Sequence, residues 1–195
     1  MTVFVGLTGG VAAGKSAALA AFQDLGAEIF STDLAAHRAL GLPEVRDQLA
    51  QRWGEEVVVD GELDRDRIAK IVFADPDELK WLEGVLHPLV REQVVEWRDG
   101  LDPELELAVI EVPLLFESDM SDTFDVTVAV IADDGIRDQR LLERGQSGNA
   151  GRETRQMSQS EKAERSTHVI HNNGSLEDLA AAVADLSATL KEDQR

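Results

Sequence analysis

The stretch Gly9-Gly10-Val11-Ala12-Ala13-Gly14-Lys15-Ser16 matches the pattern G-x-x-x-x-G-K-[ST] without a gap. Glycines let the chain turn tightly and let backbone N–H groups approach a row of phosphates. The lysine of this pattern reaches the β- and γ-phosphates of a nucleotide, and the hydroxyl after it ligates Mg²⁺. An apolar run, Val3–Leu7, precedes the stretch and the helix-forming residues 17–22 follow it. The stretch therefore predicts a nucleotide-binding P-loop between a strand and a helix.

The remaining strand signals alternate with helical ones, which favours a parallel sheet with helices packed on it. We expect an α/β P-loop NTPase fold with a five-stranded parallel sheet flanked by helices. The last helix begins after Ser175 and carries an apolar stripe. The predicted strands are Val3–Leu7, Glu28–Phe30, Ala108–Val112, Val126–Ala132 and His168–Ile170, and the predicted helices flanking them are 15–25 and 176–190.

The stretch of about 34–107 carries no convincing strand signal and is expected to form helices. An all-helical insertion at this place is where a P-loop kinase would carry the lobe that binds its phosphate acceptor. Asp75, Pro76 and Glu78 mark a helix start, with Asp as N-cap and Pro at the first position. Pro88 predicts that this helix breaks or kinks near His87. We expect one kinase domain, with a core of about 1–33, 105–143 and 160–195, a helical lobe of about 34–104 and a lid of about 144–159.

The charge of the chain conflicts at first sight with a phosphate ligand. The 195 residues include 19 basic and 38 acidic side chains, a net charge of −19, and no cysteine. Nucleic acid is therefore a poor partner. There is no signal-peptide pattern and no apolar run near the ~20 residues that cross a bilayer. We expect a soluble cytoplasmic monomer that does not bind membranes.

The basic residues gather late in the chain, where a focused positive cleft for a small phosphorylated ligand is reasonable. Planar guanidinium groups suit phosphate oxygens and stabilise charge when a lid closes. We expect Arg140 and one or two lid arginines to act in this way, whereas Arg137 fits best a solvated helix face paired with acids. The group consists of Arg137, Arg140, Arg144, Arg152, Arg155, Lys162 and Arg165.

Two acids follow predicted strands, at the sheet edge where open α/β folds bind ligands. Asp33 either caps the next helix or, beside a P-loop, accepts the proton of the acceptor hydroxyl. Glu111 either holds the metal, directly or through water, or is an ordinary strand-end acid. His87, before a proline, is more often a packing or capping residue than a catalyst.

Taken together, these motifs resemble those of the dephospho-coenzyme A kinase family over nearly the whole chain. The most specific are the His-Pro and Pro-Leu-Leu-x-Glu motifs. The motifs are Gly6–Gly10 with Gly14-Lys15-Ser16, Asp33-Leu34-Ala35-Ala36-His37, Leu86-His87-Pro88-Leu89, Val112–Glu117, Arg152 with Gln156-x-Ser158, and Val169–Gly174.

The resemblance implies transfer of phosphate from ATP, with Mg²⁺, to the ribose 3′-hydroxyl of dephospho-coenzyme A. Lys15, Asp33 and Arg140 are then catalytic, with Asp33 as the base, and Ser16 ligates Mg²⁺. Residues 9–16 and Ala17 bind ATP, joined by Arg144, Asn172 and Gly174, the last two near adenine. Thr8, Asp33, His87, Pro113, Leu114 and Glu117 are implied to contact the acceptor.

The sequence departs from the family at several places: Val11 stands where Gly or Ser is usual, Ala17 where Thr is usual, and Ser166-Thr167 where Ala-Asp is usual. Ala12 and Ala13 stand where Gly or Ser is usual, and we expect them to adopt negative φ or tolerable strain without loss of binding. Ser31 replaces the first acid of the usual Asp-x-Asp, a role that Glu111 could take over. Two other functions stay open: another small-molecule P-loop kinase, and an ATP-binding regulator without catalysis.

Overall fold

The computed structural model describes residues 1–118, 120–143, 145 and 156–192. The chain divides into two compact units. The sheet unit comprises Met1–Ser31 and Leu101–Arg195, and the helical unit comprises Thr32–Gly100. Within the described residues, no helix combines the length and the apolar character needed to cross a membrane.

The sheet unit is built on a five-stranded sheet in which every neighbouring pair is parallel, in the order β2-β5-β1-β6-β7. This confirms the predicted sheet. Because β1 is the central strand, the P-loop leaves the sheet from the middle of its carboxyl edge. The strands are β1 (Val3–Gly9), β2 (Glu28–Ser31), β5 (Leu107–Glu111), β6 (Val126–Ile131) and β7 (His168–His171).

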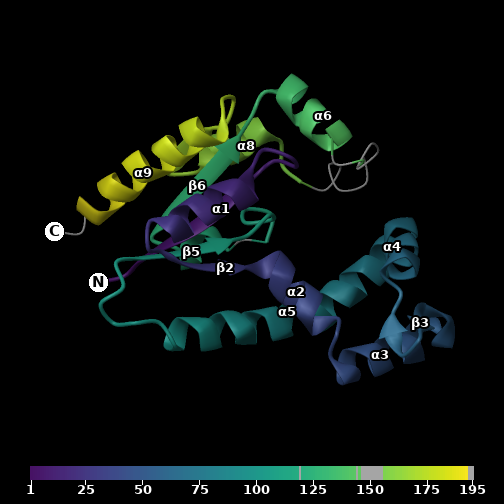
Figure 1. Ribbon diagram of the computed structural model, residues 1–195. Coiled ribbons are helices and arrows are strands. Elements are labelled where there is room, and N and C mark those ends of the chain that lie inside the picture. The colour runs from purple at the N-terminus through teal and green to yellow at the C-terminus, as the bar shows by residue number, and fades with distance from the viewer. Residues whose placement is uncertain (119, 144, 146–155, 193–195) are drawn as a thin grey trace. The chain divides into compact units, whose positions relative to one another are not determined.

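One face of this sheet is covered by α1 (Lys15–Asp24) and α9 (Leu176–Glu192), which lie side by side (Figure 1). Alternate residues of the strands point to this face, as the period of a strand requires. They form a dry core with the apolar stripes of the two helices. Its fully buried members include Val5, Leu7, Phe22, Val109, Val128 and Val183.

Beyond the strands, α1 and α9, the described part of the sheet unit contains two further helices and a 3₁₀ turn. The short helix α8 (Gln159–Arg165) packs against β6 and β1. It begins with a capping box, in which Ser158 and Glu161 satisfy each other's backbone N–H groups. Before it come the 3₁₀ turn η2 (Ser121–Thr123) and α6 (Asp134–Glu143).

The helical unit has its own core, with Val45, Leu49 and Val57 fully buried. It is not entirely helical, because β3 and β4 form a two-residue antiparallel hairpin around Asp60 and Gly61. The elements are α2 (Thr32–Ala39), α3 (Pro43–Trp53), the 3₁₀ turn η1 (Glu55–Val57), β3 (Val58–Val59), β4 (Glu62–Leu63), α4 (Arg65–Ala74) and α5 (Pro76–Asp99).

The long helix α5 begins as predicted, with the Asp75 carboxylate accepting from Asp77 N at 2.9 Å and Pro76 at the first position. Of the predicted break or kink near His87, the break does not occur, since α5 continues through Pro88, whereas a kink stays a prediction. Proline removes one helical hydrogen bond. Leu82 and Leu86 pack into the core before Pro88 and Leu89 packs after it, so tertiary contacts hold the helix on both sides.

Glu78 joins α5 to α3 at the edge of this core. Its carboxylate accepts two hydrogen bonds from Arg52, at 2.8 and 3.0 Å, and one from Trp53 Nε1 at 2.7 Å. Trp53 also packs edge-on against Trp81, with ring centroids 5.2 Å apart. The hydrogen bonds from Arg52, and then that from Trp53, hold the pKa of Glu78 below its usual value.

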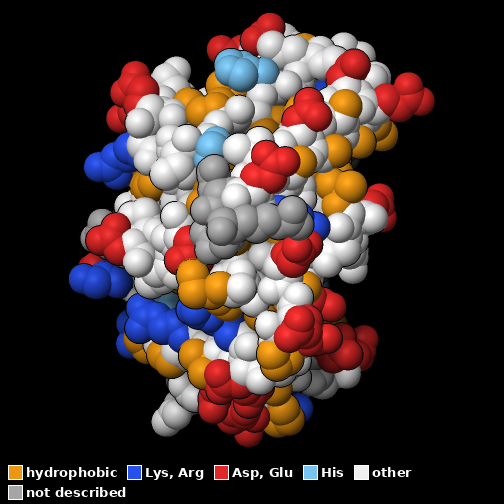
Figure 2. All heavy atoms as spheres, turned by 90° about the vertical axis from the view of Figure 1, so that its left-hand side faces the viewer, with side chains coloured by type: hydrophobic (Ala, Val, Ile, Leu, Met, Phe, Trp, Pro, Cys, Tyr) orange, Lys and Arg blue, Asp and Glu red, His pale blue; other side chains and the backbone are white. Residues whose placement is uncertain are grey.

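The surface reflects the excess of acidic residues. Figure 2 shows Asp and Glu side chains spread over much of one face, with fewer Lys and Arg side chains among them. Such a surface disfavours contact with polyanions. A phosphorylated ligand therefore needs a local cradle whose own groups outweigh the surrounding charge.

Candidate functional site

The predicted P-loop is the turn between β1 and α1. The helix starts at Lys15, and its N-cap is Gly14, in a left-handed conformation with φ 102°. The first N–H groups of a helix have no acceptor within the helix, and they carry the positive end of its dipole. The loop and the start of α1 therefore form a cradle for phosphate oxygens.

Two glycines of the loop are required by close approach. A Cβ at Gly9 would lie 2.1 Å from the Val130 carbonyl oxygen of β6. A Cβ at Gly14 would lie 2.0 Å from Asn172 Nδ2. Ala12 lies in the left-handed region, with φ 58°, so it takes up strain that glycine would avoid.

Lys15 and Ser16 stand at the mouth of the cradle. The Lys15 ammonium donates to the carbonyl oxygens of Gly9 at 3.1 Å and Gly10 at 3.0 Å. It is therefore held over the loop, where it can meet the outer phosphates of a nucleotide. Ser16 is exposed in the first turn of α1, so its hydroxyl is accessible to a metal ion.

Asn172, directly after β7, fastens the loop from the side. Its amide Nδ2 donates to the Ala13 carbonyl at 2.8 Å, and its backbone N donates to Ile131 O at 2.8 Å. Only 3% of the residue is exposed. This side chain therefore holds the P-loop through the Ala13 carbonyl. The place near adenine that the resemblance implies for Asn172 and Gly174 stays a prediction.

Arg140, on α6, also contacts the P-loop and Asn172. One guanidinium nitrogen lies 3.5 Å from the carbonyl oxygens of both Ala12 and Ala13, and another donates to Asn172 O at 3.2 Å. The sequence placed Arg140 in the phosphate clamp, and the structure brings its positive charge against the loop. Its contact with a phosphate remains a prediction.

The interpretation of Arg137 as a solvated side chain is wrong. Its guanidinium donates to Val11 O at 2.9 Å and pairs with Asp134 at 2.9 Å, and 15% of the side chain is exposed. Helical spacing predicts which residues share a face but not what that face packs against. Arg137 and Arg140 together bring two cations to the outer side of the P-loop.

Other basic residues singled out in the sequence, Arg144, Arg152 and Arg155, lie outside the described residues, as does most of the predicted lid. Their predicted part in a phosphate clamp stays a prediction. Lys162 and Arg165 are on α8, in the described part of the chain.

Glu111, the last residue of β5, is 7% exposed, so it is not an ordinary solvated acid. Its Oε2 accepts from Ser31 Oγ at 3.1 Å, across the pairing of β2 with β5. The serine that replaces the usual first acid thus hydrogen-bonds to the carboxylate on the neighbouring strand. Both side chains lie at the carboxyl edge of the sheet, on the same edge as the P-loop.

Asp33 and His87 belong to the helical unit. Asp33 is exposed in the first turn of α2, two residues after the end of β2, and His87 is exposed on α5. An acid in the first turn of a helix is favoured by the helix dipole. The role of Asp33 as a base and the contact of His87 with the acceptor stay predictions.

The segment after β5 carries the other implied acceptor contacts, Pro113, Leu114 and Glu117. Pro113 O accepts hydrogen bonds from Thr8 Oγ1, at 3.3 Å, and from Lys162 Nζ. Glu117 Oε1 accepts from Met157 N at 2.7 Å and pairs with Lys162 Nζ at 3.1 Å. Thr8 is fully buried, so its hydroxyl supports this segment from beneath.

Lys162 was expected only as one of several cations for phosphate. Instead its side chain has no exposed surface, and burial lowers its pKa, an effect that the neighbouring Glu117 carboxylate partly offsets. Nothing in the local sequence of α8 indicates this burial. It follows from the packing of α8 against the sheet.

A cavity of about 530 Å³ opens beside the P-loop, within the sheet unit. Its walls come from the loop, from α6 and from the segment that leads into α8, so it adjoins the proposed phosphate cradle. It is lined by Gly10, Val11, Asp134, Arg137, Asp138 and residues 156–160.

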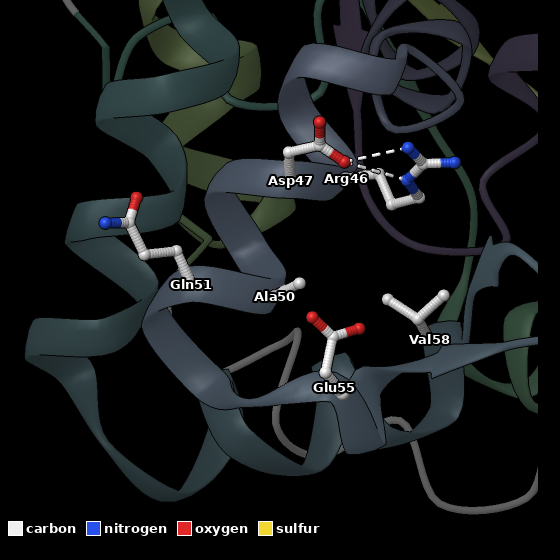
Figure 3. Close-up of a pocket in the computed structure, with 6 residues that line it drawn as sticks. All are labelled: Arg46, Asp47, Ala50, Gln51, Glu55 and Val58. Atoms are coloured by element: carbon white, nitrogen blue, oxygen red, sulfur yellow. Dashed lines mark hydrogen bonds and ion pairs between the residues drawn. The ribbon is translucent and has the colours of Figure 1, made fainter.

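A second cavity, of about 470 Å³, lies in the helical unit beside α3 (Figure 3). Its basic group, Arg46, is already paired with Asp47 at 2.8 Å, and Gln51 points away from the other lining side chains. Ala50, Glu55 and Val58 complete the wall. None of these lining residues belongs to the P-loop, and they do not form a set of side chains suited to phosphoryl transfer. We therefore do not place the active site there.

A metal ion would have to share its coordination with a ligand. Among the residues that the structure describes, no three His, Cys, Asp or Glu side chains cluster closely enough to hold a metal. Mg²⁺ commonly binds through one or two protein oxygens, several waters and substrate phosphates. The Ser16 hydroxyl and the Glu111 carboxylate are oxygen ligands of the type that Mg²⁺ prefers.

The chain matches a known protein family over most of its length. The family model of dephospho-CoA kinase matches residues 3–178. The dephospho-CoA kinase of Thermus thermophilus is 37% identical over 191 residues, which cover 96% of this chain and 92% of that protein. That of Streptococcus pneumoniae is 31% identical over 201 residues, which cover the whole of both chains.

Solved structures extend the likeness to three dimensions. The crystal structure of TT1252 from Thermus thermophilus has a TM-score of 0.82 at 38% identity, covering 97% of this chain and 98% of that one. Shikimate kinase from Acinetobacter baumannii, at 13% identity and a TM-score of 0.53, covers 97% of this chain and 94% of its own and shares the fold alone. The chain belongs to the dephospho-CoA kinase family.

Proposed function

We propose that this protein is a dephospho-CoA kinase, which transfers the γ-phosphoryl group of ATP to the ribose 3′-hydroxyl of dephospho-CoA. The observation that carries the proposal is the P-loop cradle, held by Asn172 and Arg140, in a chain that matches the family over residues 3–178. A generic nucleotide-binding domain would need the cradle but not the family motifs after β5.

The chain's own groups divide the work of phosphoryl transfer. The backbone N–H groups of the P-loop and Lys15 bind and orient the phosphates, and they stabilise the charge that develops on the transferred group. Arg140 and Arg137 bring further positive charge to the outer side of the loop. We propose that these cations, with Lys15, are the local positive groups that attract the phosphates, although Arg137 also pairs with Asp134.

Asp33 is the proposed base for the acceptor hydroxyl. Two peptide steps separate it from Ser31, so its Cα lies within about 7 Å of the Ser31 Cα, at the edge where β2 ends. Its side chain is exposed and therefore accessible to an acceptor. A positioned carboxylate that accepts the proton is what transfer to a hydroxyl requires.

Mg²⁺ is the proposed cofactor, and when bound with ATP it neutralises charge on the β- and γ-phosphates. Ser16 is the proposed direct ligand, and Glu111 is proposed to hold a water of the ion. The hydrogen bond from Ser31 fixes the orientation of the Glu111 carboxylate for this task. We propose that the enzyme acts as a cytoplasmic monomer and binds neither nucleic acid nor membranes.

The test is a coupled assay of ADP release from Mg·ATP with a panel of acceptors. We expect dephospho-CoA to be phosphorylated far faster than shikimate, gluconate or nucleoside monophosphates. A preference for one of the other acceptors would identify a different small-molecule kinase. ATP binding without acceptor-dependent ADP release would favour a regulator.

A further inference from the structure

Lys162 is a buried cation that the phosphate site does not use. Its side chain has no exposed surface, and its ammonium contacts two groups on the segment after β5, the Pro113 carbonyl and Glu117 Oε1 at 3.1 Å. A buried charge is tolerated only when it is paired and hydrogen-bonded. The ammonium thus ties α8 to the loop formed by residues 113–117.

That loop is a run of turns, in which Ser118 N donates to Leu114 O at 3.0 Å and the side chains of Leu115 and Phe116 are buried. Beyond Glu111 the chain leaves the sheet, and Pro113 has no N–H to donate. The Pro113 carbonyl is instead held from two sides, by Thr8 Oγ1 at 3.3 Å and by Lys162. Thr8 precedes the P-loop, so the same carbonyl links the loop of residues 113–117 to the phosphate cradle.

Glu117 is held by one oxygen only. Oε1 accepts from Met157 N at 2.7 Å and contacts Lys162, whereas Oε2 is buried and finds no hydrogen-bond donor among the residues that the structure describes. A buried carboxylate oxygen without a donor is costly. With no donor at Oε2, the carboxylate is held in place by the two groups that contact Oε1, Met157 N and Lys162 Nζ.

We propose that Lys162 is a positioning residue for the acceptor: through Pro113 and Glu117 it fixes the loop against which dephospho-CoA is placed. The inference rests on the proposed function, and it adds a residue that contacts neither phosphate nor acceptor. Lys162 acts on acceptor binding because both of its partners lie on the loop of residues 113–117. ATP binding is served by different residues of the P-loop.

Removing Lys162 alone would leave the Glu117 carboxylate buried without its cation, which is strongly destabilising. The informative comparison is therefore between Glu117→Gln, which leaves the buried Lys162 ammonium without its counter-charge, and the double variant Lys162→Met/Glu117→Gln, which removes both charges. Lys191→Met is the matched control, because Lys191 pairs with Glu106 at a similar distance, 3.2 Å, but on the surface.

The experiment measures KM for dephospho-CoA, KM for ATP, kcat and the melting temperature of all four proteins. Relative to Glu117→Gln, we expect the double variant to raise the acceptor KM by about tenfold or more. A small shift of the loop of residues 113–117 would misplace the acceptor, and substrate positioning is sensitive to such shifts. The ATP KM should stay close to that of Glu117→Gln. The melting temperature of the double variant should be equal to that of Glu117→Gln or higher, because no unpaired ammonium is left buried, and Lys191→Met should match the wild type.

An unchanged acceptor KM in the double variant would overturn this inference while leaving the proposed function intact. Equal increases in both KM values, or a large fall in melting temperature, would assign Lys162 to general stability and would also overturn it. If the wild type itself does not phosphorylate dephospho-CoA, the proposed function fails, and this inference fails with it.

Discussion

A methyl group added at Gly14 tests whether Asn172 holds the P-loop in its phosphate-binding shape. Gly14 combines φ 102° with a neighbour, Asn172 Nδ2, that would lie 2.0 Å from the new Cβ. Since real Cβ atoms do not approach so closely, Gly14→Ala must push the Asn172 amide away. The hydrogen bond from Asn172 to Ala13 O is then lost.

The expected destabilisation is the sum of three contributions. The left-handed backbone costs alanine about 1–2 kcal/mol. The lost hydrogen bond costs about 1 kcal/mol, and the displaced buried amide costs about 1–3 kcal/mol if it finds no new partner. We therefore expect a loss of about 3–6 kcal/mol, or roughly 6–24 °C in melting temperature for a chain of this size.

Gly26→Ala is the control, because Gly26 has φ 85° but nothing within 4 Å of an added Cβ. It should cost only the backbone contribution, about 1–2 kcal/mol. The assay is chemical unfolding of both variants, with ATP affinity measured in parallel. In an Asn172→Ala background the cost of Gly14→Ala should fall to that of the control.

Equal losses for Gly14→Ala and Gly26→Ala in the wild-type background would refute this reasoning. Such a result would mean that the Asn172 amide moves aside freely. Asn172 would then contribute little to the shape of the loop.

Three further perturbations have expected outcomes. Asp33→Asn should lower kcat by about 10²–10⁴-fold and leave the ATP KM nearly unchanged, as steady-state kinetics will show. Because the folded-state pKa of Glu78 lies below its usual value, its pairing stabilises the protein at neutral pH and is lost as the pH falls through that lowered pKa. Glu78→Gln should therefore have a lower free energy of unfolding than the wild type at pH 7. This difference in free energy between the two proteins should become smaller in acid, as urea unfolding at several pH values will show. With a net charge of −19, the melting temperature should rise as added NaCl screens self-repulsion, and a fall would contradict this.

The sheet and the P-loop could be predicted from the sequence because their signals are local. Apolar runs predict the strands, and the glycine spacing with Lys15 and Ser16 predicts the turn between β1 and α1. The helix starts at Asp75 and Ser175 followed from capping chemistry alone: the Ser175 side chain accepts from Asp178 N at 3.1 Å.

Other features depend on tertiary packing that local patterns do not contain. The burial of Lys162 and the seating of Arg137 on Val11 arise from which helix face meets which loop. Pro88 stays within a helix because core contacts on both sides outweigh one lost hydrogen bond. The β3–β4 hairpin had an available signal, Asp60-Gly61, a pair favoured in two-residue hairpin turns.

Some residues of the candidate site could be predicted from the sequence, and others could not. The P-loop residues and Arg140 came from motif and charge, and the structure brings them together with Asn172. Glu111 was expected to be either a metal ligand or a solvated acid, and its burial with Ser31 excludes the solvated alternative. Thr8 donates to the Pro113 carbonyl, and the Gln159 amide exchanges two hydrogen bonds with the backbone of Ala132. No sequence pattern indicates either contact.

The central claim is that the P-loop presents ATP to one particular hydroxyl group. The most direct measurement is identification of the product formed from Mg·ATP and dephospho-CoA by mass spectrometry and phosphorus NMR. We expect the product to be CoA, with the new phosphate on the ribose 3′ oxygen, in amounts equal to the ADP released. Phosphate at another position, or ADP released equally well without acceptor, would contradict it.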